Sequence, residues 1–179
     1  MDAEQLKRAM YANGQLDGQE AVQQARAANL PLRTYLYFDV ENTVPNRDWF
    51  DYYRGWSRAV VQENFGVGLY TRTEHAAWVS TQLLAERGFD IVMPVYWIAR
   101  YTRANANGAA VPNKDFLAPP FPAPNPTDVL PGATCWQHIG NFGMRWPDGR
   151  GGWRRFSPVD FNSSIYPDPG RGFLDSRVW

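Results

Sequence analysis

TYLYFDVEN, residues 34–42, is the stretch that decides the fold. Aromatic and β-branched residues dominate it and no glycine or proline interrupts it, so it predicts a β-strand at residues 34–41. Side chains alternate between the two faces of a strand, which puts Asp39 and Glu41 on the same face as Tyr37. The rise per residue places the two acids about 7 Å apart at the backbone, close enough to act on one bond. The alternative is a strand that ends in solvent, with both carboxylates hydrated.

Helical and strand patterns alternate on both sides of this stretch. We expect Gly14 to end a first helix and Asp17 to cap a second one. The expected helices cover residues 2–13, 17–29, 48–65 and 73–88, and the expected strands cover 34–41, 67–71, 90–99, 133–139 and 159–162, with a hairpin-like region at 140–156. Strands that alternate with helices predict right-handed crossovers and a mainly parallel sheet.

Two common architectures contain a mainly parallel sheet with crossover helices. A nucleotide-binding doubly wound fold is unsupported, because no Gly-x-Gly-x-x-Gly or P-loop motif follows any strand. The remaining common architecture is a (β/α) barrel, whose chemistry sits at the C-terminal ends of the strands. Asp39 and Glu41 come at such an end.

The length of 179 residues suits one domain with a substantial core. We expect this domain to cover residues 1–166, followed by an irregular tail at 167–179. Prolines, asparagines and alanines crowd residues 102–132 without periodicity, which predicts a long loop inside the domain. Loops of that length in a compact domain are usually functional or mobile.

Composition excludes several classes of function. Eighteen basic and eighteen acidic residues give a formal net charge of zero, so a nucleic-acid partner is not expected. The single cysteine, Cys135, excludes an internal disulfide and a thiolate metal cluster, and with only two histidines we expect neither a metal nor a cofactor. The aromatic content of 15% suits a core and also a cleft that stacks on sugar rings.

The sequence contains no apolar run long enough to cross a membrane, so no membrane contact is expected. The N-terminus lacks the apolar segment of a signal peptide. We therefore expect cytoplasmic synthesis, with release by lysis or by a non-classical route to the cell wall, and the sequence leaves the final localisation open.

Short motifs follow one another in a characteristic order along the predicted strand ends. They are YFDVEN at 37–42, GLYT at 68–71, YWIARY at 96–101, WQH at 136–138 and VDFN at 159–162. This series resembles the family 25 glycoside hydrolases, the muramidases often found in phage endolysins, and the related glycoside-hydrolase-like domains of actinobacteria and phages. The resemblance covers about residues 17–166 of the chain. It implies a TIM-barrel-like fold that lacks about the first three β/α units, which a partner chain or a missing N-terminal segment would supply.

The resemblance also implies roles for individual residues. Glu41 corresponds to the acid–base residue, Asp39 to its partner carboxylate and Asp160 to a further aspartate on the last strand. The neighbouring Asp39 and aromatic burial would raise the pKa of Glu41, so that it holds a proton near neutral pH. The residues expected to line the sugar cleft are Tyr37, Tyr70, Trp97, Tyr101, Trp136, Gln137 and Asn162.

Structural explanations for these residues stay open at this point. Asp160 could cap a turn, Tyr70 and Trp97 could be plain core, and Gln137 could satisfy backbone groups. The leading hypothesis is a peptidoglycan-directed glycosidase that cleaves the β-1,4 bond between N-acetylmuramic acid and N-acetylglucosamine. The alternative is an inactive relative that binds glycan or serves as a structural part of a phage or injection particle. A peptidase lacks support, because no His/Cys or metal-ligand constellation is present.

Overall fold

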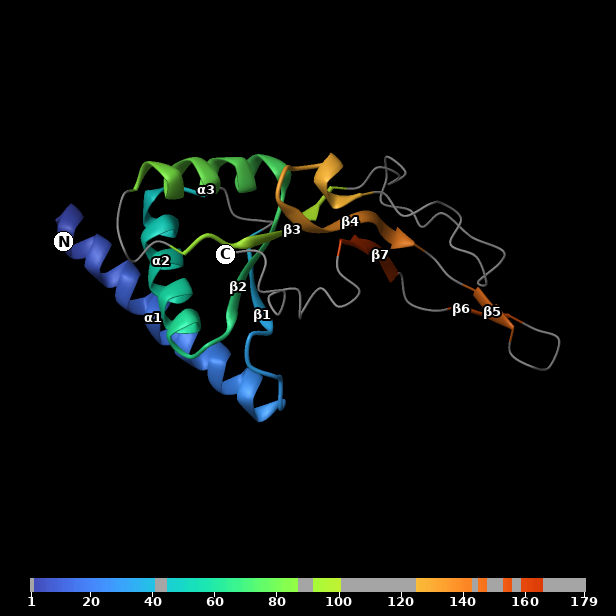
Figure 1. Cartoon of the computed structure of the whole chain (residues 1–179), viewed down its shortest axis with the longest axis horizontal. Helices are drawn as coiled ribbons and strands as arrows, with labels where there is room; N and C mark the ends of the chain where they lie inside the picture. Colours follow the sequence, from blue (N-terminus) through green and yellow to red (C-terminus); the bar gives the residue numbers. More distant parts are fainter. Residues whose placement is uncertain are drawn as a thin grey trace.

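The computed structural model describes residues 2–40, 45–86, 92–100, 125–142, 145–147, 153–155 and 159–165. Helices and strands alternate through its first half (Figure 1). The elements in chain order are α1 (Ala3–Ala27), β1 (Tyr35–Asp39), α2 (Arg47–Gln62), β2 (Gly66–Thr71), α3 (Thr73–Ala85), β3 (Val95–Ala99), the short 3-10 helix η1 (Pro126–Asp128), β4 (Ala133–Phe142), β5 (Arg145–Pro147), β6 (Trp153–Arg155) and β7 (Val159–Ser164).

Five strands form the main sheet, in the order β1-β2-β3-β4-β7. The first four are parallel, which confirms the predicted α/β class and the mainly parallel sheet. Strand β7 runs antiparallel to β4, an arrangement that needs only a hairpin-type return rather than a crossover helix. The described strands form an open sheet with β1 and β7 at its ends, so the predicted (β/α) barrel, which was expected to lack its first units, is not confirmed.

One face of this sheet is covered by helices and carries the hydrophobic core. Phe38, Leu69 and Tyr96 lie in one row across β1, β2 and β3 on this helix face. The Phe38 ring packs against three aromatic rings of α2 at centroid distances of 5.3, 5.6 and 5.9 Å. Ser80 of α3 is hydrogen-bonded to the Tyr96 hydroxyl at 2.6 Å. Both crossover helices, α2 and α3, therefore cover the same face.

The prediction that Gly14 ends a helix is wrong, because α1 continues unbroken through it. A Cβ atom at Gly14 would lie 2.0 Å from the carbonyl oxygen of Tyr52, and one at Gly55 would lie 2.0 Å from that of Tyr11. The two glycines thus allow the backbones of α1 and α2 to touch where the helices cross. Asp17 does not cap a second helix either, since it lies inside α1, and its carboxylate accepts a hydrogen bond from the Tyr52 hydroxyl.

Local chemistry sets the start of α2 close to its predicted position, whereas β3 begins five residues after the predicted start of the strand at residue 90. Helix α2 begins one residue before the predicted start, after the Asn46 side chain has accepted a hydrogen bond from the Trp49 backbone N–H at 2.9 Å. Strand β3 begins directly after Pro94, which lacks the N–H that a central strand requires.

An ion-pair cluster ties the start of α2 to the end of α3. The Arg47 guanidinium lies 2.5 Å from the Glu86 carboxylate and 3.5 Å from that of Asp51, which Arg54 approaches at 3.7 Å. The Asp51 side chain is only 3% exposed, and the two arginines are its ion-pair partners. The hydrogen bond from Arg47 lowers the pKa of Glu86.

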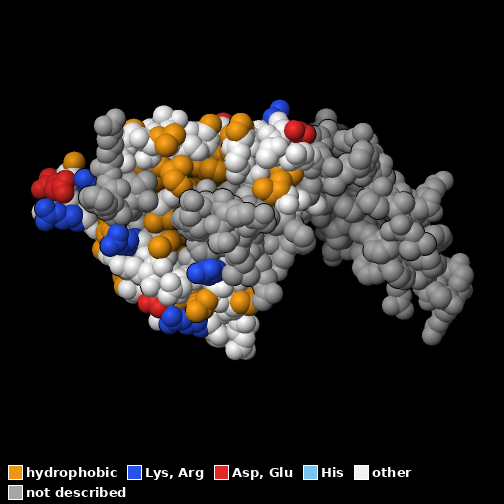
Figure 2. All heavy atoms as spheres, viewed as in Figure 1, with side chains coloured by type: hydrophobic (Ala, Val, Ile, Leu, Met, Phe, Trp, Pro, Cys, Tyr) orange, Lys and Arg blue, Asp and Glu red, His pale blue; other side chains and the backbone are white. Residues whose placement is uncertain are grey.

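Charged side chains are otherwise dispersed. Figure 2 shows basic and acidic groups scattered over one face of the described part, without a large patch of one sign. None of the described helices combines the length and the apolar character needed to cross a membrane.

Candidate functional site

The second face of the sheet carries Tyr35 and Tyr37 of β1 and Tyr70 of β2, and we call it the tyrosine face. On the neighbouring strand β2, a glycine lies beside each of the two tyrosines of β1. A Cβ atom at Gly66 would lie 2.4 Å from the Tyr35 ring, and one at Gly68 would lie 2.4 Å from the Tyr37 ring. The alternation of tyrosine on β1 with glycine on β2 therefore lets the rings lie flat on the neighbouring strand.

The Tyr37 side chain extends past the adjacent strand β2 and contacts β3. Its ring meets the Trp97 ring of β3 edge-on, with the centroids 5.4 Å apart. Its hydroxyl oxygen is buried without a hydrogen bond of standard geometry, although the thiol of Cys135 and the hydroxyl of Thr134 lie near enough to affect its pKa. Burial raises the pKa values of both the Tyr37 hydroxyl and the Cys135 thiol, so both groups stay neutral at physiological pH.

Asp39 stands at the C-terminal end of β1 and is exposed. It lies in one register row with Tyr70 of β2 and Trp97 of β3. The Tyr70 and Trp97 rings meet edge-on with their centroids 5.2 Å apart, and the Tyr70 hydroxyl donates to the Oε1 atom of Gln137 on β4. Gln137 is 4% exposed. The row thus places the exposed Asp39 carboxylate beside two aromatic rings, and the Tyr70 hydroxyl connects it to the buried Gln137 amide.

The antiparallel strand β7 adds one more polar group. Gln137 of β4 pairs with Asn162 of β7, and the Asn162 Oδ1 atom accepts a hydrogen bond from the Trp97 indole N–H at 2.8 Å. The structure therefore brings together five of the side chains that the sequence analysis selected for substrate binding. We call them the tyrosine-face cluster: Tyr37, Tyr70, Trp97, Gln137 and Asn162.

Other selected residues are not part of this cluster. Trp136 lies in the core on the helix face, because it is one residue from Gln137 and strand side chains alternate. Its indole N–H donates to the Arg100 carbonyl at 2.7 Å. Asp160 belongs to β7, but its side chain is not described. Glu41 and Tyr101 lie outside the described residues, as do most of the predicted loop at 102–132 and all of the predicted tail at 167–179.

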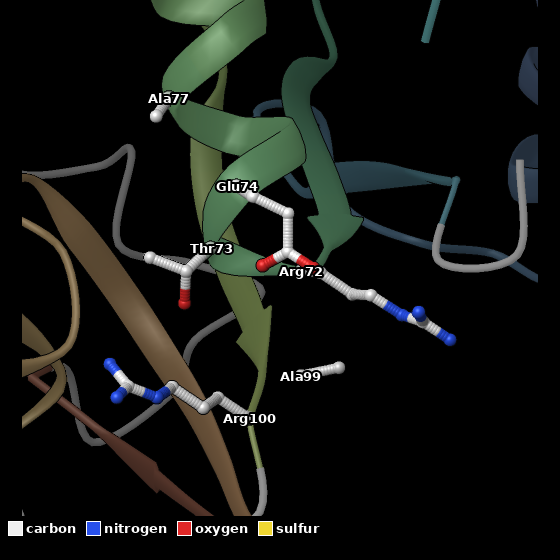
Figure 3. A pocket seen from close by; sticks show the side chains of 6 residues that line it. All are labelled: Arg72, Thr73, Glu74, Ala77, Ala99 and Arg100. Atoms are coloured by element: carbon white, nitrogen blue, oxygen red, sulfur yellow. The ribbon is translucent and has the colours of Figure 1, made fainter. Parts of the chain in front are cut away.

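A pocket of about 490 Å³ opens at the C-terminal edge of β2 and β3 (Figure 3). It adjoins the tyrosine-face cluster, since Ala99 in its wall pairs with Gln137. Its lining residues are Arg72, Thr73, Glu74, Ala77, Ala99 and Arg100. Sequence reasoning did not select the two arginines. The available signal was their position, because each directly follows a parallel strand.

The arrangement suits a polar ligand with apolar faces. Aromatic rings offer rigid surface to the C–H face of a sugar, while the exposed Asn162 amide and Asp39 carboxylate offer hydrogen bonds to its hydroxyl and acetamido groups. Within the described ranges, no group of three or more His, Cys, Asp or Glu side chains could hold a metal ion.

Comparisons with known proteins give the family of this chain. The model of the Rv2525c-like, glycoside hydrolase-like domain matches residues 2–139. No curated protein matches the chain.

A solved structure has the same fold. It is the crystal structure of an uncharacterized B. stearothermophilus protein, which is 20% identical with a TM-score of 0.50. The match covers 86% of this chain but only 63% of that one, so the chain spans less than two thirds of the length of the solved protein. At this identity the likeness establishes the fold alone. Because the family model matches most of its residues, the chain belongs to the Rv2525c-like, glycoside hydrolase-like domain family.

Proposed function

We propose that this chain is a peptidoglycan-directed glycoside hydrolase that cleaves the β-1,4 bond between N-acetylmuramic acid and N-acetylglucosamine. The row of Asp39, Tyr70 and Trp97 is the observation that carries the proposal. It combines a carboxylate with aromatic rings at the C-terminal edge of a parallel sheet, in a chain of a glycoside hydrolase-like family. Parallel α/β sheets characteristically bind their ligands at this edge.

The proposed mechanism uses two carboxyl groups. Glu41, two positions after Asp39 in the chain, donates its proton to the oxygen of the leaving sugar. Asp39 stabilises the positive charge that develops at the anomeric carbon, either by attacking it as a nucleophile or by orienting the substrate's own acetamido group for that attack. Water then attacks the anomeric carbon and returns a proton to Glu41. Asp160 is assigned to binding sugar hydroxyls or tuning the local charge.

The tyrosine-face cluster would bind the glycan. Tyr70 and Trp97 are half-buried, so parts of their rings remain available for stacking. The amides of Gln137 and Asn162 are held in place by the Tyr70 and Trp97 hydrogen bonds, which pre-organises them for a polar ligand. The expected ligand is therefore peptidoglycan or another N-acetylated glycan.

The fold part of the proposal is that this sheet is an arc of a (β/α) barrel. Strands β1 to β4 follow one another in sequence order, and α2 and α3 cover the same face. This differs from a doubly wound sheet, in which the strand order reverses and helices cover both faces. A partner chain or a further segment would supply the remaining strands beside β1.

The alternative function is glycan binding without hydrolysis, including a structural role in a phage or injection particle. One observation favours it. The strand that carries Asp39 is the end strand of the described sheet, so one side of the proposed catalytic carboxylate lacks a neighbouring strand there. A binding surface needs less enclosure than a site that must hold a proton on one carboxyl group.

Lysis of purified cell walls tests the proposal. The decrease in turbidity would be followed for the parent, Glu41→Gln and Asp39→Asn, and the released fragments would be identified by mass spectrometry. Glu20→Gln is the matched control, because Glu20 is an exposed glutamate on α1. Circular dichroism would establish that all variants fold.

We expect fragments that end in reducing N-acetylmuramic acid from the parent and the control, and none from Glu41→Gln. Equal lysis by the parent and Glu41→Gln would reject the catalytic assignment. Binding of folded parent to cell walls without any release of fragments would instead support the binding alternative.

A further inference from the structure

The pocket beside the tyrosine-face cluster has an excess of positive charge. Arg72 and Arg100 are both exposed, and neither guanidinium has a hydrogen bond or ion pair with another described residue. Glu74 is the only acid among the described lining residues, so together with the two arginines they carry a net charge of +1 (2 − 1). In the view of Figure 3, the two guanidinium groups lie on opposite sides of the pocket and the Glu74 carboxylate lies between them.

A buried hydroxyl adds a hydrogen-bonding group to the same wall. The Oγ1 atom of Thr73 is inaccessible to solvent and has no hydrogen-bond partner among the described residues. Figure 3 shows this oxygen directed toward the side of the pocket where Arg100 lies. An unsatisfied buried hydroxyl costs free energy, and a ligand oxygen would relieve that cost.

We propose that this pocket is a subsite for the carboxylate of an acidic N-acetylated glycan, an inference that rests on the proposed function. Arginine is suited to this task, because its planar guanidinium can donate two parallel hydrogen bonds to one carboxylate. Arg100 binds the carboxylate directly, and Arg72 adds positive charge from the opposite side. Rotation of the Thr73 side chain would bring its buried hydroxyl to the same carboxylate. The net charge of +1 matches one carboxylate and not two.

The position of the pocket connects it to the glycan. Ala99 in its wall pairs with Gln137, and Arg72 lies two residues after Tyr70. A sugar ring bound to the cluster would therefore direct a substituent into the pocket. Its volume of about 490 Å³ can hold such a substituent. The carboxylate can come from the lactyl ether of N-acetylmuramic acid or from a peptide attached to it.

Calorimetric titration with three ligands of equal sugar length tests this subsite. The first is an oligomer of N-acetylglucosamine, which carries no carboxylate. The second is a peptidoglycan strand stripped of its peptides, in which the lactyl carboxylates are free. The third is a strand that keeps its peptides, in which the lactyl groups are in amide linkage and the carboxylates belong to the peptide. All titrations use the Glu41→Gln background, so that bound glycan is not cleaved.

The variants distinguish the effect of the pocket's charge on binding from the effect of the protein's overall charge. Arg72→Gln, Arg100→Gln and their combination remove the positive charges, and Glu74→Gln removes the opposing one. Arg8→Gln is the matched control, since Arg8 is an exposed arginine on α1, and its nearest acid is Glu4 on the same helix.

We expect a carboxylated strand to bind about tenfold more tightly than the neutral oligomer, a preference typical of charge-assisted hydrogen bonds at a partly exposed site. The combined arginine variant should abolish the preference and leave the affinity for the neutral oligomer unchanged. Glu74→Gln should increase the preference, Arg8→Gln should not alter it, and added salt should weaken it. A preference for the stripped strand identifies the lactyl carboxylate, and a preference for the intact strand identifies the peptide.

Two results would overturn the inference. Equal binding of all three ligands by every variant would reject the carboxylate subsite and leave the proposed function intact. Failure of the folded protein to bind any of the three would reject glycan recognition itself, and the subsite with it.

Discussion

Gly68→Ala tests the packing on which the candidate site depends. A Cβ atom at Gly68 would lie 2.4, 2.5 and 2.8 Å from the Cδ1, Cε1 and Cγ atoms of the Tyr37 ring. Non-bonded carbon atoms prefer about 3.5–4.0 Å, so the ring would have to move by about 1 Å. Trp97 resists this movement, because its ring stands 5.4 Å from that of Tyr37 and its indole N–H is bonded to Asn162.

Two opposing effects set the change in the free energy of unfolding that Gly68→Ala causes. Overpacking a close-packed site costs about 1–3 kcal/mol. Alanine is intrinsically more favourable than glycine in a strand by about 0.5–1 kcal/mol. We therefore expect Gly68→Ala to lower the free energy of unfolding by about 1 kcal/mol, because subtracting the intrinsic gain from the packing cost leaves about 0–2.5 kcal/mol.

A double-mutant cycle with Tyr37→Leu isolates this contact. Removal of the ring leaves room for the new methyl group, so Gly68→Ala should be neutral or stabilising when combined with Tyr37→Leu. The expected coupling is at least about 1 kcal/mol, within the range measured for residues in contact. The control cycle combines Gly68→Ala with Tyr52→Phe on the helix side of the sheet, where the effects should add.

Urea unfolding provides the measurement. Tryptophan fluorescence and far-ultraviolet circular dichroism should give coincident transitions, which makes the free energies comparable. If the effects of Gly68→Ala and Tyr37→Leu add to within about 0.5 kcal/mol, the two residues do not press on each other and the described geometry of the tyrosine face is wrong.

Three further predictions concern the same structure. Tyr70→Phe removes the hydroxyl that donates to the buried Gln137 amide and should lower the free energy of unfolding in urea by about 1–3 kcal/mol. Tyr52→Phe, whose hydroxyl donates to an exposed carboxylate, should lower it by less than about 1 kcal/mol. Equal losses would contradict the burial of Gln137. Gly14→Ala should lower the melting temperature despite the better helix propensity of alanine, because its methyl group would meet the backbone of α2, and a raised melting temperature would refute the close helix crossing. The pKa of Glu86 is lowered by Arg47, so this carboxylate contributes stability above its unfolded pKa of about 4.3 and loses that contribution as the pH falls through its lower folded pKa. The stability difference between the parent and Glu86→Gln should therefore be constant above about pH 6 and disappear in acid, and a difference that persists at low pH would count against the ion pair.

Local patterns predicted the alternation of helices and strands from β1 to β3, but not that the two helices expected before β1 form the single helix α1. Strand β1 and helix α2 follow from their aromatic and apolar periodicity, and Pro94 marks the start of β3 through its missing N–H. The position of Asp39 at a strand end follows from the same pattern. Glu41 lies outside the described residues, so its selection stays a prediction.

The selected residues lie on two faces of the sheet, and their roles in binding and catalysis stay predictions. The strand-end motifs contain the five side chains of the tyrosine-face cluster, which the structure brings together. The same motifs named Trp136 together with Gln137, although neighbouring residues of a strand point to opposite faces and Trp136 lies in the core. Strict use of the two-residue period would have separated them.

By itself, the amino-acid sequence determined the α/β alternation and the chemical groups at the strand ends, because both depend on short-range periodicity. Tertiary contacts decided the structural role of Gly14, because a glycine that ends a helix cannot be distinguished by sequence from one that allows another helix to cross closely. They also decided the antiparallel direction of β7 and the meeting of Arg72 with Arg100 in one pocket. These features join segments far apart in the chain, which the packing of α1 on α2 and the register of the sheet bring together.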